Sequence, residues 1–132
     1  MPEENSLYDY INKSNEITKV FDRKIRVSLL SSFTINGLSE ILKVKSAERN
    51  ISCMVYESPY NQYSQEILNK KSNLYKFLPD ITFLILDTRN IFSEIFRFPY
   101  SISHLERAKV VENKINEVKN LLDSYIKNSN SK

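Results

Sequence analysis

Three short apolar segments constrain the fold of this chain of 132 residues more than any other feature. Residues 25–30, 51–56 and 81–86 are each typical of a strand that enters a core, because they carry runs of large apolar side chains. A helical pattern separates the first two, so residues 25–56 have the length of a βαβ unit with a right-handed crossover. The sequence therefore predicts an α/β domain built on a short, three-stranded parallel sheet.

The rest of the pattern predicts one domain over residues 1–132. We expect a weak N-terminal helix over 7–21, a core over 24–127 and a frayed polar tail over 128–132. Asn36 is a candidate cap for the helix that links the first two strands.

The clearest helical signal lies between residues 103 and 127. Its apolar residues alternate spacings of three and four, and they are Ala108, Val111, Ile115, Val118, Leu122 and Tyr125. This stripe predicts a long helix that either packs on its own sheet or offers a surface to another helix.

Composition excludes several classes of function. The formal charge of +3 is spread along the chain without a basic stripe, so we expect no binding of nucleic acid. A single cysteine, Cys53, and a single histidine, His104, exclude an internal disulfide and a structural zinc site. Gly37 is the only glycine, which excludes a glycine-rich phosphate loop, and we expect no cofactor. With no signal peptide and no apolar run long enough to cross a bilayer, the sequence predicts a cytoplasmic protein without membrane contact.

Polar side chains follow each of the three predicted strands. They are Ser31, Ser32, Thr34 and Asn36 after the first strand, Tyr60, Asn61, Gln62, Tyr63 and Gln65 after the second, and Asp87, Arg89 and Asn90 after the third. In a sheet of order 2-1-3 the first and third clusters face each other across a crevice, where open α/β sheets bind ligands. We therefore predict that these residues bind a ligand. A structural explanation stays open, since Thr34 and Asn36 suit a helix cap, and Asp87 and Arg89 suit a mutual ion pair.

Three motifs together resemble a known family. They are Leu30-Ser-Ser-Phe-Thr34, then Tyr56-Glu-Ser-Pro-Tyr-Asn-Gln-Tyr-Ser-Gln-Glu66, and then Ser72-Asn-Leu-Tyr-Lys-Phe-Leu-Pro-Asp80 leading into Leu86-Asp-Thr-Arg-Asn90. Over residues 24–92 the chain resembles the N-terminal domain of FkbH-like proteins, in which an SGNH-hydrolase-like domain precedes a HAD-type phosphatase domain. The resemblance implies a flavodoxin-like, three-layer α/β/α fold. It also implies a role in making acyl-carrier-bound glyceryl units for polyketides, or in capsule and sugar pathways.

The same resemblance gives little support for catalysis by this chain alone. The Asp-x-Asp nucleophile of the HAD domain is absent. Where SGNH hydrolases place their nucleophile this sequence has Phe33, so that only Ser32 or Thr34 could replace it, and Arg89 takes the place of the oxyanion-hole Asn. A nucleophilic hydroxyl needs a base within reach, and His104 is the sole candidate.

Three functions therefore stay open. The chain is a non-catalytic binding and docking module for a polar acyl or phosphorylated ligand or a carrier protein, a degenerate SGNH-type esterase, or a structural or oligomerisation fragment. In addition, three strands leave the strand over 81–86 at an edge of the sheet. That edge is covered by the long helix, by a second copy of the chain, or by a separate polypeptide such as a HAD-type phosphatase domain.

Overall fold

A computed structural model describes residues 5–129 and contains one parallel sheet of three strands. β1 (Arg23–Ser31) lies in the centre, between β2 (Ile51–Glu57) and β3 (Ile81–Ile85). Val27 of β1 pairs with Val55 on one side and with Ile81 on the other. The order β2-β1-β3 confirms the predicted strand order of a flavodoxin-like fold.

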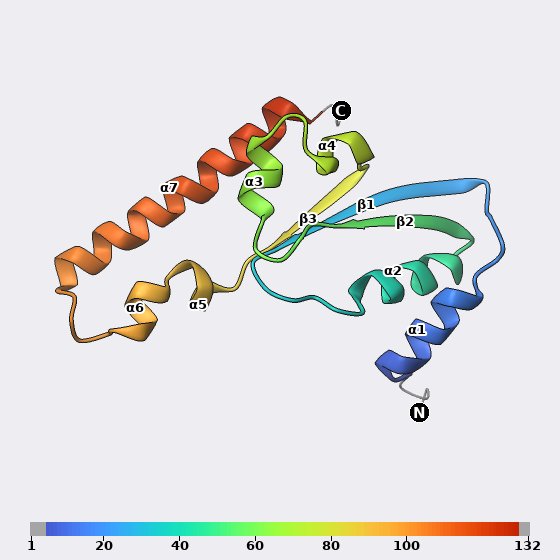
Figure 1. Cartoon of the computed structure of the whole chain (residues 1–132), viewed down its shortest axis with the longest axis horizontal. Coiled ribbons are helices and arrows are strands. Elements are labelled where there is room, and N and C mark those ends of the chain that lie inside the picture. Colours follow the sequence, from blue (N-terminus) through green and yellow to red (C-terminus); the bar gives the residue numbers. More distant parts are fainter. Residues whose placement is uncertain (1–4, 130–132) are drawn as a thin grey trace.

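Helices cover both faces of the sheet and make the fold three-layered (Figure 1). α1 (Leu7–Glu16) and α2 (Leu38–Ala47) lie on one side. α3 (Tyr63–Leu68), α4 (Asn73–Phe77) and the long α7 (His104–Asn128) lie on the other. The sequence predicted the strands, α2 and α7 closely.

The side of the sheet that faces α3, α4 and α7 holds the main core. Leu30 of β1 packs there with Ile67, Leu74 and Leu121, each buried. A chain of hydroxyl groups crosses the same layer, because the Thr82 hydroxyl lies 2.6 Å from the Ser28 hydroxyl and 2.6 Å from that of Tyr125. This network fixes the C-terminal part of α7 on the sheet.

The N-terminal part of the chain differs from the prediction in two details. The first helix stops at Glu16, where Ile17 takes an extended conformation, because Asn12, Ser14 and Asn15 are poor helix formers. Asn36 does not cap α2.

Gly37 takes the cap position of α2 instead. Its φ is +88°, a value that glycine adopts without strain, and no side-chain cap bond forms. A Cβ atom at Gly37 would also collide with the side chain of Leu7. The single glycine therefore turns the chain into α2 and lets α1 pack closely against that turn.

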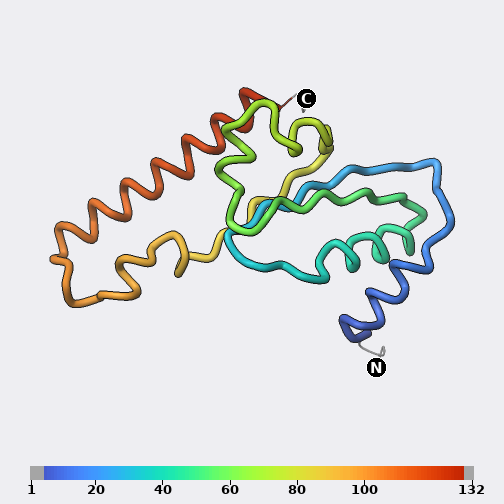
Figure 2. The backbone as a smooth tube through the Cα atoms, viewed as in Figure 1, coloured from blue at the N-terminus to red at the C-terminus, as the bar shows by residue number. Residues whose placement is uncertain are grey.

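Two short helices and the first half of α7 extend beyond the end of the sheet (Figure 2). α5 (Thr88–Ile91) and α6 (Ser93–Arg97) follow β3 and lead into α7. Because this half of α7 leaves the sheet behind, Val111 and Ile115 of the predicted apolar stripe are exposed, and so is Ala108. α7 also continues through Asn128, so the predicted tail begins later than expected, and residues 130–132 lie outside the described residues.

Within residues 5–129, no helix has both the length and the apolar character that a membrane span requires.

Candidate functional site

Ser32 joins the carboxyl ends of the two strands β1 and β3. Its backbone N–H donates to the Ile85 carbonyl oxygen at 3.1 Å, and its hydroxyl accepts a hydrogen bond from the Asp87 backbone N–H at 2.8 Å. The Asn90 side-chain amide donates to the Ser32 carbonyl oxygen at 3.0 Å. Ser32 is buried, with 1% of its surface exposed. The first and third polar clusters therefore meet, as the strand order predicted.

Asp87 and Arg89 interact with each other. The Asp87 carboxylate caps α5 by accepting from the Arg89 backbone N–H at 2.9 Å, and it receives the Arg89 guanidinium at 3.2–3.3 Å. The side-chain hydrogen bond from Arg89 is the largest of the contacts that hold the pKa of Asp87 below its usual value. This geometry matches the structural explanation that the sequence left open for this pair.

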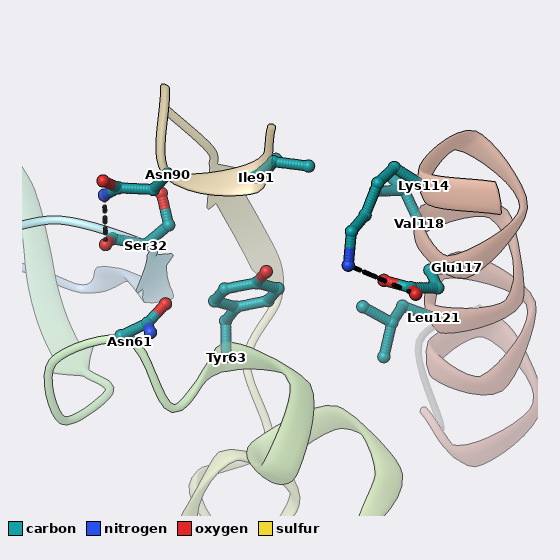
Figure 3. A pocket seen from close by; sticks show the side chains of 9 residues that line it. All are labelled: Ser32, Asn61, Tyr63, Asn90, Ile91, Lys114, Glu117, Val118 and Leu121. Carbon is teal, nitrogen blue, oxygen red and sulfur yellow. Dashed lines mark hydrogen bonds and ion pairs between the residues drawn. The ribbon is translucent and has the colours of Figure 1, made fainter. Parts of the chain in front are cut away.

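A pocket of about 150 Å³ opens beside Ser32, between the ends of the strands and α7 (Figure 3). It is lined by Ser32, Asn61, Tyr63, Asn90, Ile91, Lys114, Glu117, Val118 and Leu121. Ser32 directly follows β1, Asn61 lies in the loop before α3, and Tyr63 is the first residue of α3. Asn90 and Ile91 come from α5. The residues from α7 are Lys114, Glu117, Val118 and Leu121. Four separate parts of the chain thus converge on one hollow.

The pocket combines neutral amides with one ion pair. The Lys114 ammonium lies 2.9 Å from the Glu117 carboxylate, and this carboxylate raises the pKa of Lys114. Asn61 sits in the loop before α3 with φ +54°, a left-handed conformation that asparagine tolerates better than most residues. Among the described residues, neither the Asn61 amide nor the Tyr63 hydroxyl hydrogen-bonds to another protein group. These groups are free to bind a polar molecule.

The structure brings four of the predicted binding residues together in the pocket, namely Ser32, Asn61, Tyr63 and Asn90. The others lie outside its lining, and they are Ser31, Thr34, Asn36, Tyr60, Gln62, Gln65, Asp87 and Arg89. Ser31 is buried and its hydroxyl accepts from the Phe33 N–H, whereas Tyr60 is 68% exposed.

Sequence reasoning missed the contribution of α7. Lys114 and Glu117 are spaced for an ion pair within one helical turn, which is a visible signal, but such pairs are common on solvent-facing helices. Their position beside the strand ends follows only from how α7 packs.

A second hollow of about 210 Å³ lies at the opposite end of the sheet, where residues 17–21 cross α2 and the start of β2. Ile17, Val20, Ala47 and Ile51 give it a mainly apolar lining. Its lining also includes Lys19, Lys43 and Ser52. Open α/β sheets bind their ligands at the carboxyl ends of the strands, and this hollow lies at their amino ends, so we place the candidate site beside Ser32.

The candidate catalytic residues do not come together. His104 is the exposed first residue of α7, at the end of that helix that is remote from the sheet (Figure 1). The Ser32 hydroxyl is engaged by the Asp87 N–H, and Thr34 is exposed. Among residues 5–129, no group of three His, Cys, Asp or Glu side chains is placed to hold a metal ion.

A comparison with known protein families identifies the family to which this chain belongs. The family described as FkbH, N-terminal domain, matches residues 26–130, which is most of the chain. The chain belongs to the FkbH N-terminal domain family. No curated protein matches this FkbH N-terminal domain.

A solved structure shares the fold of this FkbH N-terminal domain. It is the crystal structure of the N-terminal part of a Bacteroides fragilis protein that contains a phosphatase domain, complexed with Mg. The TM-score is 0.72 at 20% sequence identity, and the match covers 91% of this chain and 31% of the other. The chain thus spans about a third of the length of the solved protein that it matches.

Proposed function

We propose that this FkbH N-terminal domain is a binding and docking module that holds a small polar ligand without transforming it. The observation that carries the proposal is the pocket beside Ser32, where Asn61, Tyr63, Asn90 and Lys114 converge at the carboxyl ends of β1 and β3. Open α/β sheets bind their ligands at this place.

The lining of the pocket favours a polar acyl or phosphorylated ligand. The Lys114 ammonium, which pairs with Glu117 at 2.9 Å, has further N–H donors for a carboxylate or phosphate, and the amides of Asn61 and Asn90 suit hydroxyl and carbonyl groups. At about 150 Å³ the pocket accommodates the tip of such a molecule, such as the acyl end of a group carried on an acyl carrier protein. The rest of a carried group would then lie over the exposed loop around Tyr60.

The surroundings of Ser32 support binding over hydrolysis. A serine nucleophile must give its proton to a base, and the one histidine, His104, begins α7 at the end remote from the sheet, so no imidazole lies near Ser32. We therefore favour recognition over the esterase alternative.

The family and the solved neighbour support a broader role beside a phosphatase. The neighbour contains a phosphatase domain, and the resemblance to FkbH-like proteins implies a HAD-type phosphatase domain beside this fold. We infer that the present domain presents its ligand to such a domain, in the same polypeptide or in trans, in polyketide, capsule or related biosynthesis.

The test is a calorimetric titration of the full chain with D-glycerate, inorganic phosphate and pantetheine as separate probes. We expect at least one probe to bind. Lys114→Met should lower the affinity for an anionic probe by roughly tenfold, because hydrogen bonds to charged groups contribute about 1.5 kcal/mol or more.

Lys45→Met is the matched control for Lys114→Met. Lys45 also pairs with a glutamate three residues further along its helix, Glu48 at 3.1 Å, but it lies on α2 and outside the pocket. Equal effects of the two substitutions, or no heat with any of the three probes, would refute the proposal.

A further inference from the structure

The second hollow, at the amino ends of the strands, has a fixed wall. Residues 17–21, which follow α1, form one side of it, and the end of α2 with the start of β2 forms the other. The Phe21 N–H donates to the Ser52 hydroxyl oxygen at 2.7 Å, a contact across 31 residues of sequence. Because this bond holds the segment 17–21 on β2, the hollow is a feature of the folded chain.

The size and the apolar walls of the second hollow suit a single ring. Its apolar side chains are those of Ile17, Val20, Phe21, Ala47 and Ile51, and its volume is about 210 Å³. An apolar protein cavity of about 150 Å³ holds a benzene molecule. The second hollow therefore has room for a ring, or a branched chain of similar size, with one small polar group attached.

Two lysines give the second hollow a positive charge. Lys43 lines it from α2, and Lys19 lines it from the segment 17–21, where its ammonium lies 5.0 Å from the centre of the Phe21 ring. Among residues 5–129, neither ammonium forms an ion pair with a carboxylate, and none of the side chains that line the hollow is acidic. Cations that lack such a partner, beside apolar walls, favour an anion with an apolar body.

Ser52 adds a hydroxyl donor to the same wall. Its oxygen accepts from the Phe21 N–H, but its own proton has only a distant acceptor, the Phe21 carbonyl oxygen at 3.5 Å. A carboxylate in the hollow would be a better acceptor for that proton, because hydrogen bonds to ionised groups are about twice as strong as those between neutral groups. Ser52 therefore joins the two lysines as a donor to an anion.

We propose that the second hollow is a binding site for a small apolar carboxylate. The ligand is a free compound whose ring or branched chain lies against the apolar walls while its carboxylate binds Lys19, Lys43 and Ser52. A carboxylate fits better than a phosphate, because the apolar walls offer few donors for a third oxygen and a second charge. The site lies at the other end of the sheet from Ser32 and is independent of the function proposed above.

Methyl NMR of the full chain tests the site, with phenylacetate as the probe. We expect saturable shifts of the Ala47 and Ile51 methyl signals, with a dissociation constant on the order of 1 mM or lower. Phenylacetamide has nearly the same shape without the charge, so it should bind about tenfold more weakly. Acetate has the charge without the ring and should cause no saturable shift.

Lys43→Met tests the charge of the site. It removes a charged donor, so it should lower the affinity for phenylacetate by about tenfold. Lys45→Met is the matched control, because Lys45 lies two residues further along α2, pairs with Glu48 at 3.1 Å and lies outside the hollow.

Two further variants locate the bound probe. Ala47→Leu fills the hollow at the last residue of α2 and should abolish the shift of the Ile51 signal with an unchanged far-UV circular dichroism spectrum. Lys114→Met, in the pocket beside Ser32, should leave the affinity for phenylacetate unchanged.

The absence of a saturable shift up to about 10 mM phenylacetate would overturn the proposal. Equal affinities for phenylacetate and phenylacetamide, or equal effects of Lys43→Met and Lys45→Met, would also overturn it. A loss of binding in Lys114→Met but not in Lys43→Met would place the probe beside Ser32, which would likewise contradict a site at the amino ends of the strands.

Discussion

The Ser32 hydroxyl accepts a hydrogen bond from the Asp87 backbone N–H at 2.8 Å, across 55 residues of sequence. This contact ties the end of β1 to the start of α5 and sets one wall of the candidate pocket. It also gives the hydroxyl oxygen a structural role as a hydrogen-bond acceptor.

We expect Ser32→Ala to destabilise the fold by about 1–3 kcal/mol, because it leaves the partly buried Asp87 N–H without a partner. Urea unfolding measures the change in the free energy of unfolding. Thr34→Ala, two residues further on and exposed, is the control and should change that free energy by less than about 0.5 kcal/mol. Equal stabilities of the two variants would show that the Ser32 bond contributes nothing.

Tyr125→Phe tests how α7 is held on the sheet. The substitution removes the hydroxyl that bonds to Thr82, so we expect a loss of about 0.5–1.5 kcal/mol in urea unfolding. The loss stays moderate because Thr82 keeps its bond to Ser28. Tyr100→Phe, at a residue that is 98% exposed, should have no effect, and a loss of the same size there would contradict this explanation.

The raised pKa of Tyr56 predicts that the free energy of unfolding decreases at alkaline pH. Burial, and then the charge of Glu66, raise the pKa of Tyr56 to about 12 in the folded chain. The folded state holds this proton more tightly than the unfolded state does, so the contribution is complete below the ordinary tyrosine pKa near 10 and is lost as the pH rises from about 10 to 12. Tyr56→Phe should therefore reduce the fall in unfolding free energy over that interval. An unchanged pH dependence in Tyr56→Phe would rule out this residue as the cause.

Arg89→Ala should raise the pKa of Asp87 towards its ordinary value. The guanidinium is the largest cause of the lowered pKa, and the Arg89 backbone N–H, which remains in the variant, keeps part of the shift. A carbon-13 NMR titration of the Asp87 carboxyl group measures it. If the pKa of Asp87 did not move, the ion pair in the structure would not form in solution.

The fold could be predicted because its signals are local. An apolar run in the sequence indicates each strand. The order strand, helix, strand over residues 25–56 is compatible with few topologies other than a right-handed parallel βαβ unit. Asn36 and Gly37 show the limit, since both residues suit a helix start. Gly37 rather than Asn36 takes the cap position because the Leu7 side chain packs closely against it, and this contact is not visible in the sequence.

Four of the nine residues that line the pocket could be predicted for the same reason. Ser32 and Asn90 follow directly from strand ends and strand order. Lys114 and Glu117 could not be placed, because α7 contacts the sheet only with its C-terminal half and buries a line centred on Leu121. The predicted apolar stripe omits Leu121 and includes Leu122, which is 46% exposed, so the sequence did not determine the rotation of α7.

The most direct measurement for the central claim is a nitrogen-15 NMR titration of the full chain that follows the Asn61 side-chain amide on addition of D-glycerate, inorganic phosphate or pantetheine. We predict a saturable shift of this signal with at least one probe. Asn61→Gly, which keeps the positive φ of +54°, should reduce affinity for that probe, whereas Asn50→Gly, at a turn with φ +59° before β2, should not. Unmoved Asn61 and Asn90 amides with all three probes, or equal affinities of the two glycine variants, would contradict a ligand site beside Ser32.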